Sequence, residues 1–546
     1  MATLLVELLT EELPPKALKK LGLSFGASIF EDLSKQNLIP ENASYETFAT
    51  PRRLAVLLNG ARNVSPVESV RLKLMPKHVG IKEDGTPSDA LLKKLNSLGL
   101  EPSHAEEVEL QTDGKMEFIY LHQKKDGVTL SAGLQRAIDL SITKLPIPKV
   151  MNYQPQDTLQ SVNFVRPAHR LMAMHGPDVV PIQALGLTSG NKTLGHRFHA
   201  NGDITIPDAK SYESTLEELG FIIPNYEKRK SNIRDQLYVQ ATKMNLTLQE
   251  DEELLDEVTS LVELPIVYPA QFDEEFLAIP AECLVLTMKT NQKYFPLFNK
   301  NGALAEKFLL VSNMKLEDPS NIVHGNEKVV RPRLADAQFF YQGDIDTPLE
   351  DLTKKLKNVV YHNQLGSQLD RVDRLINLAR RISEKTNADS AKVTRAAELC
   401  KADLLTGMVG EFPELQGTMG RYYALAQGES PEVADALEQY YRPRFSNDSI
   451  PNSPISSTLA LADKLEILVG IFGVGLIPSG EKDPFGLRRQ AIGIIRILTE
   501  NSINADLSVL ISWAAQTFSQ NLNLTIEESV IKNFIIDRFR GHLKDK

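Results

Sequence analysis

The sequence predicts a multidomain α+β protein with a mixed α/β N-terminal region and an all-helical C-terminal region. The chain has 546 residues, which is too long for a single hydrophobic core. Up to about residue 345, short apolar runs alternate with amphipathic segments, as strands and helices do. Beyond that point Leu365, Leu369, Val372, Ile376 and Ala379 recur at the helical period. We therefore place domain boundaries so as to give residues 1–65, 66–345, 346–503 and 504–546.

The composition excludes some classes of function. Hydrophobic residues make up 42% of the chain and the net charge is −10, which excludes a uniformly basic protein that coats nucleic acid. Local basic patches remain compatible with this net negative charge. The two cysteines, Cys283 and Cys400, predict a cytoplasmic protein without a disulfide framework. We expect no signal peptide, no membrane partner and no DNA partner, since the first 15 residues lack a basic segment and no run of 18 apolar residues occurs.

The first elements are a strand at residues 3–9 and a helix that continues to Leu38. Thr10 is the predicted N-cap of this helix, because Glu11 and Glu12 would then lie in its first turn. A second strand follows at residues 50–58, with Arg52 and Arg53 at its entry. Two interpretations of these arginines are open: a solvated strand end, or a bidentate contact with phosphate or carboxylate.

Histidines concentrate in two segments of the region that follows. Phe164–Arg170 and Gly195–His199 contain three of them, and His175 comes shortly after the first segment. No pair has the helical spacing of a zinc protease site and no CxxC accompanies them, so the pattern does not favour a metal. Histidines that are packed or belong to a surface network, or histidines that contact RNA or a partner subunit, are the remaining interpretations. Further predicted elements lie at residues 82–100, 116–122, 128–144, 280–290 and 308–312.

A basic segment precedes the predicted helical region. Lys328, Arg331 and Arg333 lie close to the aromatic residues 339–341, and Pro332 suits the first turn of a helix. Basic residues beside aromatic ones are typical of an RNA-facing element, although a solvated helix start explains them equally well. Residues 343–348 are predicted to form a linker.

Three residues of the helical region follow the order of a metal phosphohydrolase of the HD type. Such a site needs a histidine, an adjacent His-Asp pair and a distal aspartate, and here His362, Asp403 and Asp463 fit. Ala402 stands where the paired imidazole would be, and alanine ligates no metal. We predict an HD-type fold without a metal. Asp403, in the helix that the preceding apolar spacing predicts, is then a structural charge.

The turn at residues 478–489 is the second basic candidate. Lys482, Arg488 and Arg489 outweigh Glu481 and Asp483, and Arg496 lies two helical turns further on. A shaped basic turn at a helix start can hold a phosphate, and an ordinary solvated loop is the alternative. The sequence has no phosphate-binding P-loop, no GxGxxG after a strand, no GxSxG and no HExxH, so it shows no nucleotide-binding motif of its own.

Nine stretches in chain order resemble one known family, the β subunits of bacterial-type heterotetrameric glycyl-tRNA synthetases. They are Thr10–Pro14, Thr50–Ala55, Phe164–Pro167, Gly195–Phe198, Glu257–Glu263, Arg331–Ala337, Met408–Gly420, Leu461–Leu465 and Lys482–Arg489. Arg170 and Leu264 depart from the family pattern, which has tryptophan at these positions. The chain also ends before the C-terminal helical anticodon-binding domain that such subunits usually carry, so we expect a truncated chain.

The resemblance implies a division of labour. An α subunit of class II type holds glycine, ATP and Mg²⁺ and makes glycyl-adenylate, while the β subunit grips tRNA(Gly) and delivers its 3′ end. It further implies an α₂β₂ assembly, a part within residues 66–345 that resembles the B3/B4 region of phenylalanyl-tRNA synthetase, and an HD-like domain at 346–503. This chain alone would then be inactive and bind no cofactor or metal.

The basic clusters are the candidate tRNA-binding residues: Arg52, Arg53, Lys328, Arg331, Arg333, Lys482, Arg488, Arg489 and Arg496. Two other functions are kept as alternatives. One is a metal-dependent HD phosphohydrolase that would use His362, Asp403 and Asp463. The other is a purely structural scaffold for the α subunit.

Overall fold

Strand β1 (Ala2–Thr10) lies at the centre of a seven-stranded sheet in the computed structural model, which describes residues 1–82, 84–113, 116–154, 161–480, 482–520, 522 and 524–544. β1 pairs antiparallel with β3 (Arg53–Ala61) on one side and with β9 (Ala168–His175) on the other. β2 (Tyr45–Thr50) extends the sheet beyond β3. On the other side β9 pairs with β10 (Asp178–Val179) and with β12 (Leu187–Gly190), and β12 with β11 (Gln183–Ala184).

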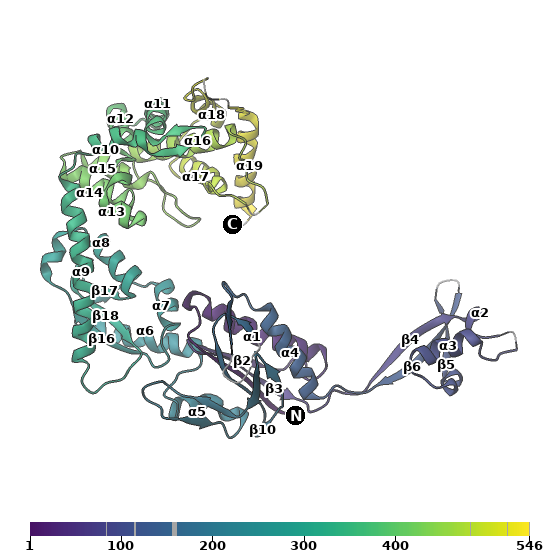
Figure 1. The fold of residues 1–546 in the computed structure, drawn as a ribbon. Coiled ribbons are helices and arrows are strands. Elements are labelled where there is room, and N and C mark those ends of the chain that lie inside the picture. The colour runs from purple at the N-terminus through teal and green to yellow at the C-terminus, as the bar shows by residue number, and fades with distance from the viewer. Residues whose placement is uncertain are drawn as a thin grey trace. The chain divides into compact units, whose positions relative to one another are not determined.

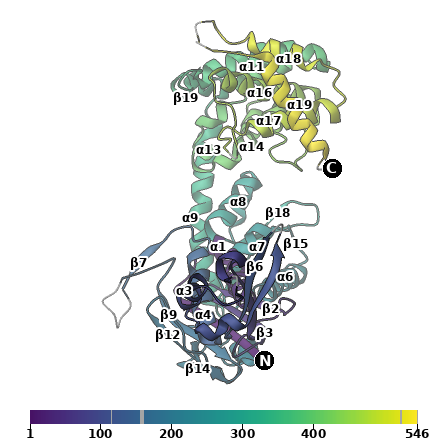
Figure 2. The same cartoon turned by 90° about the vertical axis from the view of Figure 1, so that its right-hand side faces the viewer.

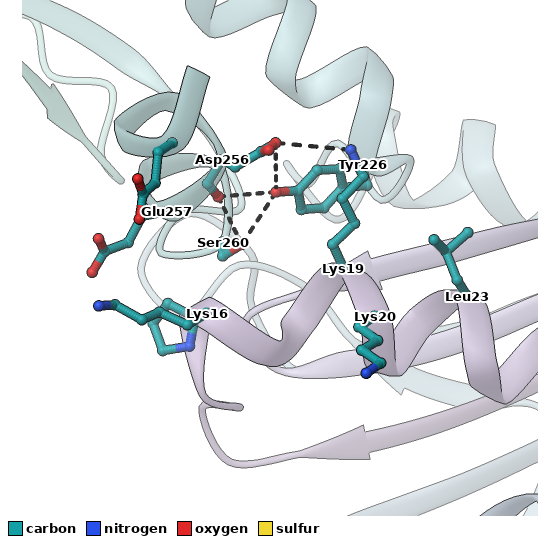
Figure 3. Close-up of a pocket in the computed structure, with 10 residues that line it drawn as sticks. Lys16, Lys19, Lys20, Leu23, Tyr226, Asp256, Glu257 and Ser260 are labelled. Carbon is teal, nitrogen blue, oxygen red and sulfur yellow. Dashed lines mark hydrogen bonds and ion pairs between the residues drawn. The ribbon is translucent and has the colours of Figure 1, made fainter. Parts of the chain in front are cut away.

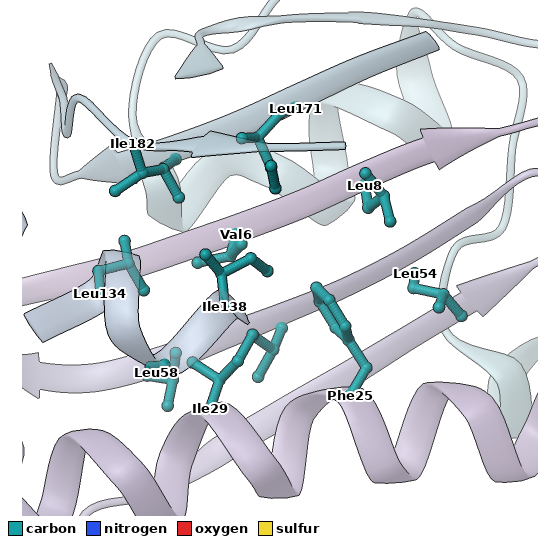
Figure 4. Packing of buried hydrophobic residues seen from close by; sticks show 14 of the residues in the cluster. Val6, Leu8, Phe25, Ile29, Leu54, Leu58, Leu134, Ile138, Leu171 and Ile182 are labelled. Atoms are coloured by element: carbon teal, nitrogen blue, oxygen red, sulfur yellow. The ribbon is translucent and has the colours of Figure 1, made fainter. Parts of the chain in front are cut away.

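Alternation along β1 gives the sheet two buried faces. Leu4, Val6 and Leu8 face helices α1 (Pro15–Lys35) and α4 (Leu130–Lys144), in a core that Figure 4 shows from close by. Leu5 lies in a second core, on the other face, with Phe48, Met172 and Tyr212. A strand buried on both faces reads as a continuous apolar run, which is why residues 3–9 were recognisable.

The predicted N-cap of α1 is wrong. Thr10 is the last residue of β1, and its backbone amide donates to the carbonyl of Arg52 (2.7 Å). α1 begins at Pro15, after Pro14, and no side chain caps it. Pro15 suits the first helical position because it has no amide hydrogen to satisfy.

Two further sheets have cores of their own. β4 (Glu68–Pro76), β6 (Met116–Lys125) and β5 (Val108–Asp113) pair in that order, and helix α3 (Asp89–Ser97) buries Leu91 and Leu95 with Ile119 and Leu121. The other sheet has the order β15 (Thr247–Leu248), β17 (Phe295–Phe298), β18 (Leu304–Ser312) and β16 (Ile266–Gln271). Apolar residues of α6 (Tyr226–Lys243) and α7 (Glu252–Thr259) share its core. The shorter elements are α2 (Lys77–Gly80), β7 (Met151–Tyr153), β8 (Val162–Phe164), β13 (Lys192–Leu194), β14 (Asp203–Thr205) and α5 (Tyr212–Glu218).

The chain divides into two units, labelled by their elements in Figures 1 and 2. Unit 1 consists of Met1–Ala270, Lys293–Asn301 and Phe308–Val323, and unit 2 of Gln271–Gln292, Gly302–Lys307 and His324–Lys546. Among the described residues, no helix combines the length and apolar character that a membrane crossing requires.

Unit 2 is almost entirely helical and is built around α16 (Pro454–Gly473), nearly all of whose residues are buried. Helices α11 (Gln368–Thr386), α15 (Pro431–Gln439), α17 (Leu487–Glu500) and α18 (Leu507–Ala515) pack against it. The predicted helix is present as α11, but Leu365 precedes its first residue, and its buried apolar residues are Val372, Leu375, Leu378, Ala379 and Ile382. The remaining elements are α8 (Ala281–Thr287), α9 (Ser320–Ile345, whose first four residues belong to unit 1), α10 (Leu349–Lys355), β19 (Val360–His362), β20 (Gly366–Ser367), α12 (Ser390–Leu399), α13 (Gly407–Glu411), α14 (Thr418–Ala426) and α19 (Glu528–Lys544).

Two local predictions in unit 2 are wrong. Pro332 lies inside α9, which begins at Ser320 and runs on to Ile345, into the predicted linker. Asp403 does not lie in a long helix: α12 ends at Leu399, and residues 402–405 form a 3₁₀ turn. The turn aims the Asp403 carboxylate at two backbone amides, those of Gly417 (2.5 Å) and Gly420 (3.2 Å). Those bonds offset part of the cost of burying the charge.

Candidate nucleic-acid interface

Arg53 belongs to the core of unit 1. Its guanidinium lies 3.3 Å from a carboxylate oxygen of Glu7 and donates to the carbonyl of Leu194 (2.8 Å). Thr193 and Tyr212 donate to the same Glu7 carboxylate, each at 2.5 Å. The side chain of Arg53 is 1% exposed, so it holds β1, β3 and β13 together and does not reach an external ligand.

The segment 257–263 attaches to the same sheet through a buried acid. Thr50 donates to Glu263 (2.7 Å), and the Arg53 Nε lies 3.7 Å from that carboxylate. Arg229 of α6 donates to the carbonyl of Ala49 (2.6 Å), which fixes α6 to the end of β2. Stretches far apart in sequence thus meet at one end of the sheet, where β2 ends and β3 begins.

Glu11, in the stretch Thr10–Pro14, brings two more motif stretches to that end of the sheet. Its carboxylate lies 2.9 Å from Nε2 of His169 and 3.5 Å from the guanidinium of Arg197, and its amide donates to Pro167 (2.8 Å). His196 is buried, which lowers the pKa of its imidazole and favours the neutral form. Phe198 beside it is 67% exposed, and Arg52 is partly exposed. The histidine clusters are therefore a packing and hydrogen-bond network with an aromatic residue at its surface.

On α9 the three predicted cations have different surroundings. Arg331 pairs with Asp273 and Glu275. Lys328 and Arg333 are exposed, and no ion pair or side-chain hydrogen bond holds them among the described residues. These two side chains are the ones on α9 that an anionic ligand can recruit without breaking an internal contact.

The turn before α17 already contains an anion of its own. The Asp483 carboxylate accepts from the amides of Leu487 (2.8 Å) and Arg488 (3.0 Å), the first donors of the helix. The Arg488 guanidinium donates to the carbonyl of Gly480 (2.6 Å), while Glu481 lies outside the described residues.

Because the helix start is capped from within, only cationic side chains remain to attract a phosphate at this turn. Arg496, further along α17, pairs with Glu500 (2.7 Å) and donates to Ser446 (2.9 Å). Of the four cations, Lys482 and Arg489 are exposed and lack a partner within the part of the chain that the structure describes.

The positions of the HD pattern do not share a binding point. Asp463 lies 2.9 Å from the Lys401 ammonium and 3.0 Å from the Arg371 guanidinium. His362 accepts from the amide of Gln364 (3.2 Å), and Ala402 is buried. In the described ranges no three His, Cys, Asp or Glu side chains are arranged to hold a metal ion. Two internal cations occupy the carboxylate that a metal would need, so the residues present do not fit a divalent ion.

The pKa values of Asp403 and Asp463 are shifted in opposite directions. Burial raises the pKa of Asp403 to about 6, against the effect of the Gly417 and Gly420 amides. Burial would also raise the pKa of Asp463, but the charges of Arg371, Lys401 and Lys464 lower it to about 2. Hydrogen bonds from amides thus counteract the rise in pKa that burial causes less fully than neighbouring cations do.

A cavity of about 400 Å³ in unit 1, between α1, α6 and α7, was not predicted (Figure 3). Tyr226 lies in it and donates to the backbone carbonyl (2.9 Å) of Asp256, within reach of its carboxylate (3.2 Å), and burial raises the Tyr226 pKa to about 12. The lysines on one wall face an equal number of acids on the other: Lys16, Lys19 and Lys20 against Glu253, Asp256 and Glu257. This balance gives the cavity no preference for an anion.

Comparison with known proteins assigns the chain first to a class, the components of aminoacyl-tRNA synthetases. A family model described as glycyl-tRNA synthetase beta subunit matches residues 4–546, and the chain belongs to this family. A glycine–tRNA ligase beta subunit of Ralstonia nicotianae is 49% identical over 550 residues, which is 100% of this chain and 78% of the relative. The beta subunit of Methylobacillus flagellatus is 48% identical over 100% of this chain and 79% of its own length. That of Neisseria meningitidis is 48% identical over 95% of this chain and 74% of its own length.

Proposed function

We propose that this chain binds tRNA(Gly) and presents its acceptor end to a catalytic α subunit, which uses ATP and Mg²⁺ for glycylation. The proposal rests on one observation above all, the family match over residues 4–546. An α₂β₂ assembly, a B3/B4-like part in residues 66–345 and an HD-like domain in 346–503 belong to the same proposal. In this proposal, the chain itself binds no ATP or metal.

The geometry favours a subset of the basic residues as the tRNA contacts. Phosphate contacts need cations that are exposed and not committed elsewhere. Lys328, Arg333, Lys482 and Arg489 meet this requirement, and Arg52, which is partly exposed, meets it in part. The others bind groups of this chain and act on its structure: Arg53, Arg331, Arg488 and Arg496.

The deciding experiment is glycylation of a tRNA(Gly) transcript by this chain, by the α subunit, and by the two together. We expect charging only with both, and a mobility shift of the transcript with this chain alone. Charging by this chain alone would overturn the division of labour. Full charging without any tRNA complex of this chain would favour a structural scaffold. A tRNA lacking its anticodon arm, in the same assay, separates contacts with the acceptor arm from contacts with the anticodon arm.

A phosphohydrolase function is not favoured. Lys401 and Arg371 neutralise Asp463, and alanine precedes Asp403, so no set of ligands for an activating metal remains in this cluster. Stoichiometric manganese or iron in the purified protein, with phosphatase turnover lost in Asp403→Ala, would contradict this.

A further inference from the structure

A second cavity, of about 380 Å³, lies in unit 2 where three chain segments meet. One wall is the segment that carries Glu414 and Gln416, another carries Tyr441 and Arg444, and the third is the first turn of α17 with Arg489 and Gln490. Its volume falls within the range of small-ligand sites. Only Arg489 of this group was singled out from the sequence.

The cavity has two cations available for a ligand. The side chains of Arg444 and Arg489 are exposed, and neither has an ion pair or side-chain hydrogen bond to the rest of the described chain. The guanidinium of Arg489 lies back over Gly486, where an added Cβ would come within 2.8 Å of it. Two uncommitted guanidinium groups beside one hollow are suited to a phosphate.

A buried lysine adds positive charge behind the wall. Lys464 is 2% exposed, donates to the carbonyl of Tyr440 (3.2 Å), and lies under Gly493 beside the cavity residue Pro443. Burial lowers its pKa to about 8. Of the nearby acids, Asp463 is neutralised by Lys401, whereas Asp448 keeps its charge and accepts from the backbone amide of Arg444. Glu414 is the one carboxylate among the described residues that line the cavity.

The cavity wall that carries Gln416 is fixed by a hydrogen bond to the buried Asp403. Asp403 accepts from the amide of Gly417 (2.5 Å), the residue after Gln416. Gly417 has φ +83° and fits against the Tyr441 ring, where a Cβ would lie 2.8 Å from ring carbons. The amide of Gln416 therefore projects from a fixed backbone, which reduces the ordering cost of binding.

We infer that this cavity binds a single nucleotide unit of RNA, which deepens the tRNA binding proposed above and rests on it. Arg444 and Arg489 hold the phosphate, and the amides of Gln416 and Gln490 bond to the base or ribose. Glu414 would repel a phosphate placed next to it, so it accepts from a hydroxyl or amino group at the other end of the nucleotide.

The first test is the affinity of the full chain for a tRNA(Gly) transcript, measured by mobility shift over a range of salt. We expect Arg444→Ala and Arg489→Ala each to weaken binding about 3- to 10-fold and to lower the salt slope by about one. Gln416→Ala combined with Gln490→Ala should weaken binding with the slope unchanged. The matched control is Arg380→Ala, an exposed cation on α11 away from the cavity. Cavity variants that bind like this control overturn the inference.

The second test uses adenosine monophosphate and inorganic phosphate as probes, with saturation-transfer NMR on the full chain. We expect a signal from the nucleotide in the wild type, its loss in the Arg444→Ala/Arg489→Ala double variant, and only weak competition by phosphate. Equal competition by phosphate would overturn a nucleotide site in favour of a simple anion site. If the wild type binds the nucleotide but no tRNA, the proposed function fails while the cavity stands.

Discussion

Unit 2 contains two sets of cations that look alike in the sequence and differ in their surroundings. The buried charge cluster consists of three cations and two acids: Arg371, Arg374, Lys401, Asp463 and Glu466. The side chain of Glu466 is 0% exposed. Both pairs, Arg371 with Arg374 and Asp463 with Glu466, have i,i+3 spacing on the facing helices α11 and α16. Lys482 and Arg489, in the turn before α17, have exposed side chains and no such partners among the described residues. A cation's partners, more than its sequence neighbours, decide whether it stabilises the fold or is free to bind a ligand.

The largest expected effect is the loss of Glu466. Glu466→Ala removes the partner of Arg371 (2.9 Å) and Arg374 (2.9 Å) and leaves two buried cations underpaired. We expect the free energy of unfolding to fall by about 3–5 kcal/mol, measured by urea denaturation. Lys482→Ala, the control from the exposed set, should change it by less than about 0.5 kcal/mol. Similar small losses in both variants would remove the distinction between the two sets.

Asp403 should give the next largest effect, through pH. Its pKa of about 6 in the folded protein lies above the ordinary value of 3.8, so the folded state keeps a proton that the unfolded state loses. Stability should therefore decline from pH 4 to pH 6, by up to about 3 kcal/mol, and stay level above that. In Asp403→Asn this decline should be absent.

The measurement is urea denaturation of both proteins from pH 4 to pH 8. Asp463 provides the opposite case, because its pKa of about 2 lies below the ordinary value. Its contribution is present above pH 4 and is lost as the pH falls toward 2. A wild-type curve that rises between pH 4 and pH 6 in parallel with that of Asp403→Asn would contradict the assignment for Asp403.

A smaller effect is expected on α9, and on binding alone. Arg333→Ala removes an exposed cation, whereas Arg331→Ala removes one that pairs with Asp273 and Glu275. We expect Arg333→Ala to weaken tRNA binding about 3- to 10-fold at low salt and to leave the thermal midpoint unchanged. Arg331→Ala should change affinity less. The reverse order of the two variants would show that internal pairing does not predict the contacts.

The smallest effect is expected for Arg496→Ala. Its guanidinium pairs with Glu500 and bonds to Ser446, and its side chain is 12% exposed. We expect tRNA affinity within about twofold of the wild type, since a partnered cation offers little to a phosphate. A loss as large as that of Arg489→Ala, in the same mobility-shift assay, would place Arg496 in the interface.

Local patterns predicted the elements, and distant partners determined the site. The apolar run at residues 3–9 and the helical period of 365–379 depend on neighbours in sequence, so β1 and α11 could be predicted. Arg52 and Arg53 are adjacent, yet one is partly exposed and the other is buried against Glu7 and Glu263. Nothing local separates them, because those acids come from other parts of the chain. Arg444 was missed as a cavity residue because the other walls of the cavity come from distant segments of the chain.

The interleaving of the two units bears on how the protein can be cut. Unit 1 takes up three separate stretches of chain, and its last two lie beyond the start of unit 2. A fragment that stops at Ala270 would lack β17 and β18, and so the strands that β15 and β16 neighbour in their sheet. The backbone groups of both strands would lose their pairing, and the apolar face of α7 would be uncovered. Removal of the helical half at this point should therefore yield an insoluble product, and fragments for separate study should run through Val323.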